Sequence, residues 1–301
     1  MTDGVGPMGA RIGIEAASTE LTLAEPARRP DRGALAALGQ HWPEYGIEAA
    51  GLGLFMVSAC LFAALLEHPG SPIRQAVADP WLRRIPMGLA MGLTAVSLIY
   101  SPWGQRSGAH FNPSVTLTFW RLGTIEPWDA VFYVLAQVAG GMVGVALAAL
   151  ALGGLVAHPS VNYAATVPGT GGAGVAFVAE VTITFILMTV VLTVSNRPDL
   201  NRFTGLCAGA LVASYIVVEA PLSGMSMNSA RTLGSAIFAQ LWTAFWVYAT
   251  APLIGMLAAA QLYRATQGAP RVRCAKLHHD NTQRCIFRCG YGGSGADPAQ
   301  D

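Results

Sequence analysis

The sequence predicts an all-α membrane protein with six transmembrane helices and two re-entrant half-helices in an inverted repeat. The chain of 301 residues is 53% hydrophobic and only 12% charged, about half the charged share of soluble domains. Six apolar stretches each approach the ~20 residues that a helix needs to cross a bilayer. Two shorter apolar stretches, one in each half, begin with an asparagine. Together these observations exclude a large soluble core.

The chain divides into three regions by composition. Residues 1–43 are polar and lack the apolar core of a signal peptide, so we expect a disordered cytosolic N-terminus. The apolar domain covers 44–264, with inverted repeats at about 44–158 and 174–264, and a cytosolic tail that contains Cys and His follows at 265–301. The six membrane helices are expected at 46–67, 85–102, 129–157, 174–196, 203–220 and 239–263.

Glycine pairs recur within these spans. Gly140 and Gly144 share one helix face, as do Gly205 and Gly209. Small residues let membrane helices approach closely. We expect both faces to pack against helices of the same chain; a contact between subunits is the alternative.

The apolar stretches at 112–122 and 228–237 are too short to cross a bilayer. Loops rich in Gly, Ser and Pro precede both, which predicts helices that enter the membrane and turn back. Such backbone is tolerated only where it is buried in protein or lines a wet cavity. Three full spans per half, an odd number, invert the second half relative to the first. Inverted repeats with broken helices at mid-membrane are a transport architecture.

Glu48 and Glu180 lie near the starts of the first and fourth expected spans. An ionisable group inside a membrane is costly and indicates a role. We expect each carboxylate to accept hydrogen bonds from backbone N–H groups of the re-entrant loop in its own half. His110, in the first loop, is assigned the same supporting role. A carboxylate at the water interface is the plainer alternative.

Basic residues set the expected orientation. An even number of spans places both termini on one side, and the arginines before the first span and after the last put that side in the cytosol. Arg74, Arg83 and Arg84 fall in an outer loop and disagree, but most basic residues agree. We therefore expect a multi-pass protein of the plasma (cell inner) membrane, surrounded by lipid bilayer. A net charge of +1 gives no sign of nucleic-acid binding.

The two re-entrant segments carry paired motifs. Residues 107–116 read Ser-Gly-Ala-His-Phe-Asn-Pro-Ser-Val-Thr, and residues 223–231 read Ser-Gly-Met-Ser-Met-Asn-Ser-Ala-Arg. Both resemble the NPA boxes of the aquaporin and glycerol-facilitator family, the major intrinsic proteins, and the resemblance covers about 44–264. It implies an aquaporin-like fold and a homotetramer with one pore per subunit.

Both boxes depart from the family pattern. The first reads Asn112-Pro113-Ser114 and the second Asn228-Ser229-Ala230. In the family, the proline and alanine of the two boxes pack together at the channel centre, and here a serine replaces one of them in each box. Proline suits a first helical turn but is not required there, so the half-helix should survive. The two hydroxyls either leave conduction intact or change selectivity, and both outcomes stay open.

The half-helix ends predict how charge is excluded. Each N-terminus carries about +0.5 elementary charge, and two such ends at mid-membrane repel cations, hydronium included. The amides of Asn112 and Asn228 can donate to the oxygen of a passing water or alcohol; a simple helix cap is the plainer role. Arg231 lies in an apolar run, where an unpaired guanidinium is costly unless it faces water. We expect it to line the pore.

The resemblance places Arg231 in an outer selectivity filter. Spacing from the boxes gives the remaining filter positions as Ile216, Met225, and either Met91 or Gly92. Strict water channels of the family usually have a histidine at the place of Ile216. Glycerol facilitators usually follow the arginine with an aspartate, where Thr232 stands here. The filter therefore matches neither class, and flexible packing is the alternative role for the two methionines.

Three cysteines and two histidines lie within 16 residues of the tail: Cys274, His278, His279, Cys285 and Cys289. Thiolates with imidazoles suit zinc or another soft ion, although the spacing is not that of a standard Cys-x-x-Cys site. If the tail binds a metal, we expect Cys274, His278, Cys285 and Cys289 as ligands, and on a helix the first two would face one way. A redox-sensitive or partner-docking tail and an unligated tail are the alternatives.

The sequence therefore predicts a passive channel for water and small neutral solutes such as glycerol, which excludes ions and protons and needs no cofactor. One alternative is a non-conducting membrane protein whose altered boxes have closed the pore. Another is a channel regulated by metal or redox change at the tail. An enzyme is not expected, because few catalytic groups lie in the spans.

Overall fold

The computed structural model describes residues 1–2, 33–267 and 272–291. The chain divides into two units, Met1–Asp31 and Arg32–Asp301, and the helices lie in the second. The described residues contain no strand. In chain order, the helices are α1 (Ala34–Glu67), α2 (Pro72–Ala76), α3 (Pro80–Tyr100), α4 (Pro102–Ser107), α5 (Pro113–Arg121), α6 (Pro127–Leu152), α7 (Gly154–Ala157), η1 (Asn162–Ala164), α8 (Gly172–Ser195), η2 (Asn201–Phe203), α9 (Thr204–Val218), α10 (Ala220–Ser223), α11 (Ser229–Ala239) and α12 (Phe245–Thr266).

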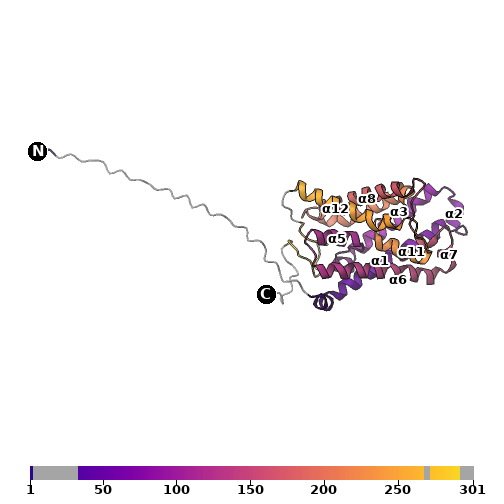
Figure 1. Ribbon diagram of the computed structural model, residues 1–301, viewed down its shortest axis with the longest axis horizontal. Helices are drawn as coiled ribbons and strands as arrows, with labels where there is room; N and C mark the ends of the chain where they lie inside the picture. The colour runs from indigo at the N-terminus through magenta and orange to yellow at the C-terminus, as the bar shows by residue number, and fades with distance from the viewer. Residues whose placement is uncertain (3–32, 268–271, 292–301) are drawn as a thin grey trace. The chain divides into compact units, whose positions relative to one another are not determined.

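Six of these helices are long and apolar enough to cross a membrane: α1, α3, α6, α8, the segment η2–α9, and α12. They run side by side through the helical unit (Figure 1). The half-helices α5 and α11 are only 9 and 11 residues long and follow the second and fifth spans. The predicted all-α membrane fold with two half-helices is confirmed.

Glycines set the contacts between spans. A Cβ atom on Gly140 of α6 would lie 2.0 Å from the carbonyl oxygen of Ala49 on α1. A Cβ atom on Gly209 of α9 would lie 2.7 Å from the carbonyl oxygen of Gly92 on α3. No side chain fits at such separations, so both glycine faces pack within the chain, as expected.

The first span begins earlier than expected, because α1 starts at Ala34 and continues through Pro43. His41 Nδ1 lies 2.7 Å from the buried Asp129 carboxylate on α6. The Tyr45 hydroxyl donates to the carbonyl of Ala37, six residues before the proline, at 3.1 Å. These contacts hold the polar segment on the helical unit. The expected disordered region of 1–43 is therefore wrong for 34–43, and its residues 3–32 lie outside the described chain.

Other span ends also differ from expectation: α3, for example, begins at Pro80 and not at residue 85. Gly153, with a φ of 54°, ends α6 at Leu152 and separates the short helix α7. Gln240, with a φ of 51°, ends α11, and α12 begins only at Phe245. Apolar composition continues across both breaks, so hydropathy alone made the third and sixth spans too long.

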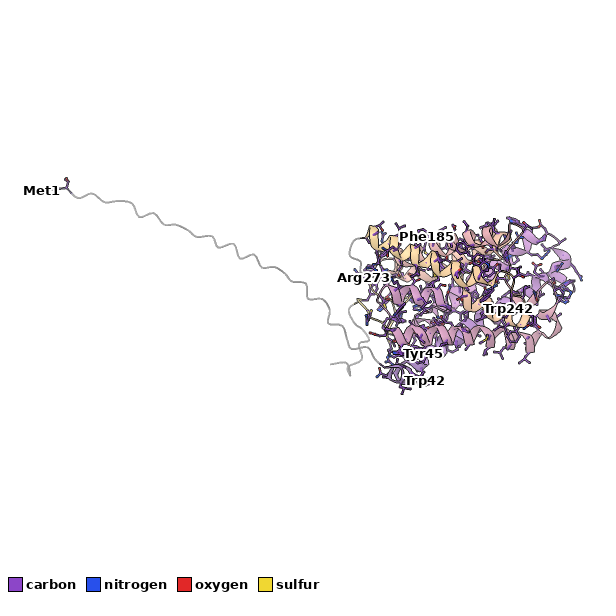
Figure 2. The ribbon with its side chains drawn as sticks, viewed as in Figure 1. Met1, Trp42, Tyr45, Phe185, Trp242 and Arg273 are labelled. Carbon is purple, nitrogen blue, oxygen red and sulfur yellow. The ribbon has the colours of Figure 1, made fainter. Side chains whose placement is uncertain are left out.

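The tail segment 272–291 packs on the end of the unit where α1 begins. Arg284 donates to the Gln40 carbonyl of α1 at 3.4 Å, and Figure 2 shows Arg273 at the same end as Tyr45. This segment has no helix among its described residues. Cys274 and His278 therefore do not share a helical face.

Candidate pore

The two half-helices begin at the box asparagines. Asn112 Oδ1 accepts the Ser114 N–H at 2.9 Å, and Asn228 Oδ1 accepts those of Ala230 and Arg231 at 3.1 Å each. Both asparagines therefore act as N-caps, which satisfies N–H groups that a helix start leaves free. The capping role uses only the amide oxygens and leaves both NH₂ groups for other partners.

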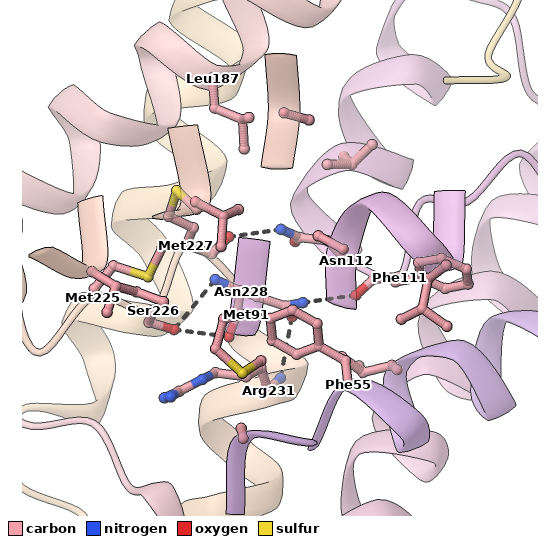
Figure 3. A pocket seen from close by; sticks show the side chains of 18 of the residues that line it. Phe55, Met91, Phe111, Asn112, Leu187, Met225, Ser226, Met227, Asn228 and Arg231 are labelled. Atoms are coloured by element: carbon pink, nitrogen blue, oxygen red, sulfur yellow. Dashed lines mark hydrogen bonds between the residues drawn. The ribbon is translucent and has the colours of Figure 1, made fainter. Parts of the chain in front are cut away.

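Each NH₂ group reaches across to the opposite half. Asn112 Nδ2 donates to the Met227 carbonyl, and Asn228 Nδ2 donates to the Phe111 carbonyl, both at 2.7 Å (Figure 3). An amide nitrogen carries two hydrogens, so one N–H of each asparagine is left for the cavity that both side chains line. The reciprocal pair fixes the two boxes against each other.

Glu48 holds the first re-entrant loop. Its Oε1 accepts the Ser107 hydroxyl at 2.7 Å and the His110 N–H at 3.1 Å, and its Oε2 accepts the Phe111 N–H at 2.6 Å. Gln137 donates to the same Oε2 at 2.8 Å. The carboxylate is fully buried. It is thus compensated by hydrogen bonds, which a buried charge requires, and the interfacial alternative does not hold.

Glu180 repeats this arrangement in the second half. Its Oε1 accepts the Ser223 hydroxyl at 2.8 Å and the Ser226 N–H at 2.6 Å, and its Oε2 accepts the Met227 N–H at 2.8 Å. The backbone bonds expected from the sequence are therefore present in both loops.

The carboxylates stabilise an unusual backbone. Ala109 and Phe111 in the first loop and Met225 and Met227 in the second all have φ between 48° and 58°. Such conformations cost a non-glycine residue about 1–3 kcal/mol each. They turn the Phe111 and Met227 carbonyls toward the asparagines of the opposite half. The strained backbone is thus what allows the reciprocal hydrogen bonds between the two boxes to form.

His110 supports its loop from the other side. Its Nε2 lies 2.8 Å from the Ala275 carbonyl oxygen and its Nδ1 lies 3.1 Å from Thr116 Oγ1. A carbonyl only accepts, so Nε2 carries the proton and Nδ1 accepts from the threonine hydroxyl. The imidazole therefore connects the first box to the tail.

A cavity of about 280 Å³ passes the two boxes. Of the six box residues, only Asn112 and Asn228 line it. Ser114 and Ser229 do not, so their hydroxyls act through packing rather than on the wall. The other wall residues are mostly apolar and include Phe55, Met87, Met91, Ile216 and Met225.

Arg231 is the cationic group beside the boxes in this apolar wall (Figure 3). Its Nη1 is buried and has no hydrogen-bond partner among the described residues. A buried donor without a partner costs free energy, unless a molecule in the cavity accepts from it. Of the two candidates on the second span, Met91 lines the cavity, whereas Gly92 packs on Gly209. The assignment of Gly92 to the filter is therefore wrong.

Comparison with known proteins agrees with this geometry. A sequence model of the major intrinsic proteins matches residues 46–263. The chain belongs to the major intrinsic protein family. A probable NIP-type aquaporin of Nicotiana alata is 33% identical over 218 residues, which cover 72% of this chain and 74% of the relative. The glycerol uptake facilitator protein-like 6 of Lactiplantibacillus plantarum is 36% identical over 58% of this chain and 82% of its own length.

The aquaglyceroporin of Plasmodium falciparum has the same fold. Its crystal structure aligns with a TM-score of 0.62 at 21% identity, over 74% of this chain and 95% of the other. The family match, the aquaporin and glycerol-facilitator relatives and the six membrane helices together show that this major intrinsic protein is a multi-pass membrane channel for water and small solutes.

Several supports of this major intrinsic protein's loops were not predicted. Tyr133 donates to the Ser107 carbonyl and Tyr248 to the Ser223 carbonyl, both at 2.6 Å. The signal was present in the sequence as a repeat, because Ser107 and Ser223 each stand five residues before a box asparagine. The tyrosines lie on α6 and α12, whose alignment by hydropathy was too coarse to pair them.

The tail of this major intrinsic protein gathers a cluster of four side chains that differs from the predicted set. Cys274, His279, Cys285 and Cys289 have donor atoms within 4.8 Å of one another. His278 instead stacks edge-on against Tyr100, with ring centroids 4.8 Å apart, so its assignment as a ligand is wrong. Burial raises the pKa of Cys274, whereas hydrogen bonds from the neighbouring thiols lower the pKa of Cys289.

Proposed function

We propose that this channel conducts water and small neutral solutes such as glycerol down their gradients, and that it excludes protons and cations. The observation that carries the proposal is Arg231 Nη1, which has no hydrogen-bond partner within the described part of the chain and lies in an apolar wall beside two asparagine-capped half-helices. A permeant that offers an oxygen would satisfy this donor, whereas a cation would meet a positive charge.

Charge exclusion follows from the ends of the half-helices. Each N-terminus adds about +0.5 elementary charge, and Asn112 and Asn228 present N–H donors there and no acceptor, because both Oδ1 atoms are used as caps. A water at this point donates to neither asparagine, so a proton relay along the file is interrupted.

The filter chemistry favours a solute with a carbon skeleton. Ile216, Met91 and Met225 offer apolar surface, and Arg231 offers hydrogen-bond donors. An alcohol can place its carbons against the apolar surface and its hydroxyl oxygens at the hydrogen-bond donors of Arg231. The relative named as a glycerol uptake facilitator fits this reading.

Stopped-flow light scattering on proteoliposomes tests the function. We expect osmotic shrinkage faster than in protein-free vesicles, and re-swelling when glycerol enters. Water flux no faster than through lipid would refute conduction. Water flux without glycerol entry would refute only the solute class.

We also propose that the protein lies in the plasma membrane with both termini in the cytosol and that it assembles as a homotetramer. The solutes that it conducts are not chemically altered. Arg83, expected in an outer loop, lies in the first turn of α3 and binds Glu67 of α1 at 2.8 Å, and the count of Lys and Arg near the termini supports the cytosolic side. Labelling of a cysteine introduced at Arg74 by an impermeant reagent on intact cells checks the orientation. Native mass spectrometry checks the tetramer.

A further inference from the structure

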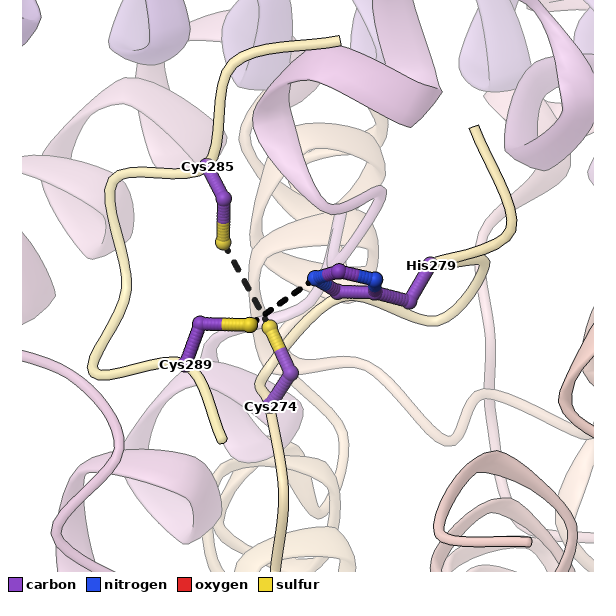
Figure 4. A group of neighbouring side chains, drawn as sticks. All are labelled: Cys274, His279, Cys285 and Cys289. Carbon is purple, nitrogen blue, oxygen red and sulfur yellow. Dashed lines mark hydrogen bonds between the residues drawn. The ribbon is translucent and has the colours of Figure 1, made fainter. Parts of the chain in front are cut away.

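The four-residue tail cluster has the geometry of a tetrahedral metal site. Cys289 Sγ lies 2.9 Å from His279 Nε2, and Cys274 Sγ lies 3.5 Å from Cys285 Sγ (Figure 4). Zinc–sulfur bonds of ≈ 2.3 Å place tetrahedral sulfurs about 3.8 Å apart. All five cysteines of the chain are free thiols. The donor atoms of Cys274 and His279 therefore already converge with those of Cys285 and Cys289.

Charge at the cluster fits a soft divalent cation. Three thiolates and one divalent ion leave a net charge of −1. The buried Lys276 supplies an ammonium group beside the cluster, where its Nζ donates to the Gln283 carbonyl at 2.8 Å. The backbone N–H of Lys276 points at Cys274 Sγ at 3.5 Å. Hydrogen bonds to ligating sulfurs are the outer-shell contacts that orient metal ligands.

The tail bridges the two halves of the channel. On the first half, the Leu277 N–H donates to the Gly108 carbonyl at 3.1 Å, and Phe287 stacks on His110 with ring centroids 5.5 Å apart. On the second half, the Arg273 N–H donates to Asn196 Oδ1 at 2.6 Å. The segment that carries the ligands thus lies across one end of the pore.

Leu277 is the part of the tail that reaches the pore. Buried Leu277 lines the central cavity, as do Leu98, Ile99 and Ala109. It stands between Cys274 and His279 in sequence. Any ion that joins those two ligands therefore fixes the position of this leucine.

We propose that Cys274, His279, Cys285 and Cys289 bind a soft divalent ion of the zinc class, and that the bound ion holds Leu277 in the cytosolic end of the pore and reduces conduction. The gating part rests on the proposed channel function; the metal site does not.

Metal content tests the site directly. The full-length protein, purified through a tag without histidines from cells supplied with zinc, is expected to hold one zinc per chain. Cys285→Ser and His279→Asn should weaken zinc binding by at least roughly tenfold, because loss of an outer-shell partner alone already costs about 10–100-fold. Cys207→Ser, a thiol outside the cluster, and His278→Asn are the matched controls and should keep the zinc.

Cobalt gives a second readout that is independent of transport. Co²⁺ added to zinc-free protein should produce thiolate-to-metal charge-transfer absorption, which Cys285→Ser abolishes and Cys207→Ser preserves. Absence of bound metal in the unmodified protein, or a Cys274–Cys285 disulfide found by intact mass, would overturn the site.

Flux tests the gate. Zinc-free protein and Cys285→Ser should conduct water several-fold faster than zinc-loaded protein, and Leu277→Ala should conduct fast while it retains zinc. Bound zinc with equal flux in all forms would overturn the gate and leave the site standing. Flux at the lipid background in every form, Leu277→Ala included, would instead refute the channel function.

Discussion

At the scale of single residues, the box asparagines carry three tasks with one amide each. The oxygen caps its own half-helix, one N–H bonds the opposite loop, and the other N–H is left for the cavity. Aspartate would lose the donors and alanine the cap. Arg231 adds the one function that the asparagines lack, a full positive charge beside the file of permeants.

Arg231→Val should raise proton leak. Removal of the guanidinium lowers the barrier to hydronium, and each ~1.4 kcal/mol lost raises the leak about tenfold. Vesicles that contain a pH-sensitive dye measure this leak under a pH gradient. Arg231→Lys, which keeps the charge, is the control. Equal leak in wild type and Arg231→Val would contradict the assigned role.

Ser229→Pro, which restores the family residue, should leave the fold intact. The Asn228 cap uses the N–H groups of Ala230 and Arg231, so a proline at the first helical position removes no bond of this cap. We expect a change in the free energy of unfolding below about 1 kcal/mol and unchanged water flux. Thr232→Pro is the contrast, because it removes the bond from Thr232 N–H to the Asn228 carbonyl and should cost ~3 kcal/mol. Thermal unfolding in detergent distinguishes the two, and equal losses in both variants would refute the argument.

At the scale of elements, each half-helix depends on a carboxylate from a full span. The loops before α5 and α11 hold left-handed residues that no helix or strand stabilises, and Glu48 and Glu180 supply the acceptors for their N–H groups. A rigid membrane helix thus fixes the shape of a segment that could not keep it alone.

Glu180→Gln should therefore impair the pore without removing the protein from the membrane. One oxygen becomes an NH₂ group, which cannot accept from Met227 or Ser226, and each lost charged hydrogen bond costs about 1.5–3 kcal/mol. We expect reduced water flux at normal membrane yield. Glu67→Gln, which alters only the contact with Arg83 away from the loops, should conduct normally. Normal flux in Glu180→Gln would show that the loop does not need this carboxylate.

Gly140→Ala should weaken the contact between α1 and α6. The added methyl would lie 2.0 Å from the Ala49 carbonyl oxygen, and such overpacking costs about 1–3 kcal/mol. Gly46→Ala, which meets nothing within 4 Å, should instead gain up to ~1 kcal/mol in helix propensity. Size-exclusion profiles and thermal unfolding should shift in opposite directions for the two variants. A stable Gly140→Ala would contradict close packing at this contact.

At the scale of the whole molecule, most of the architecture could be predicted because membrane spans are long and their hydropathy is strong. The two asparagine motifs located the half-helices to within two residues. Prediction failed where the controlling contact is between distant segments: α1 extends to Ala34 because of Asp129 on α6, and Gly92 faces another helix. His278 rather than His279 was expected as a ligand, and no local signal in the sequence shows that the backbone of the tail folds without a helix around the thiols.

The crossed amide bonds have a consequence for how the chain matures. The Phe111 carbonyl and the Asn112 NH₂ group have their partners at Asn228 and Met227, more than a hundred residues later. During synthesis the first half therefore enters the bilayer with two polar groups unmatched, in a medium where each such group is costly. A conducting path cannot exist until the last two spans arrive. The bilayer is thus protected from a leak through an incomplete protein, because the pore is completed only when the second half of the chain bonds to the first.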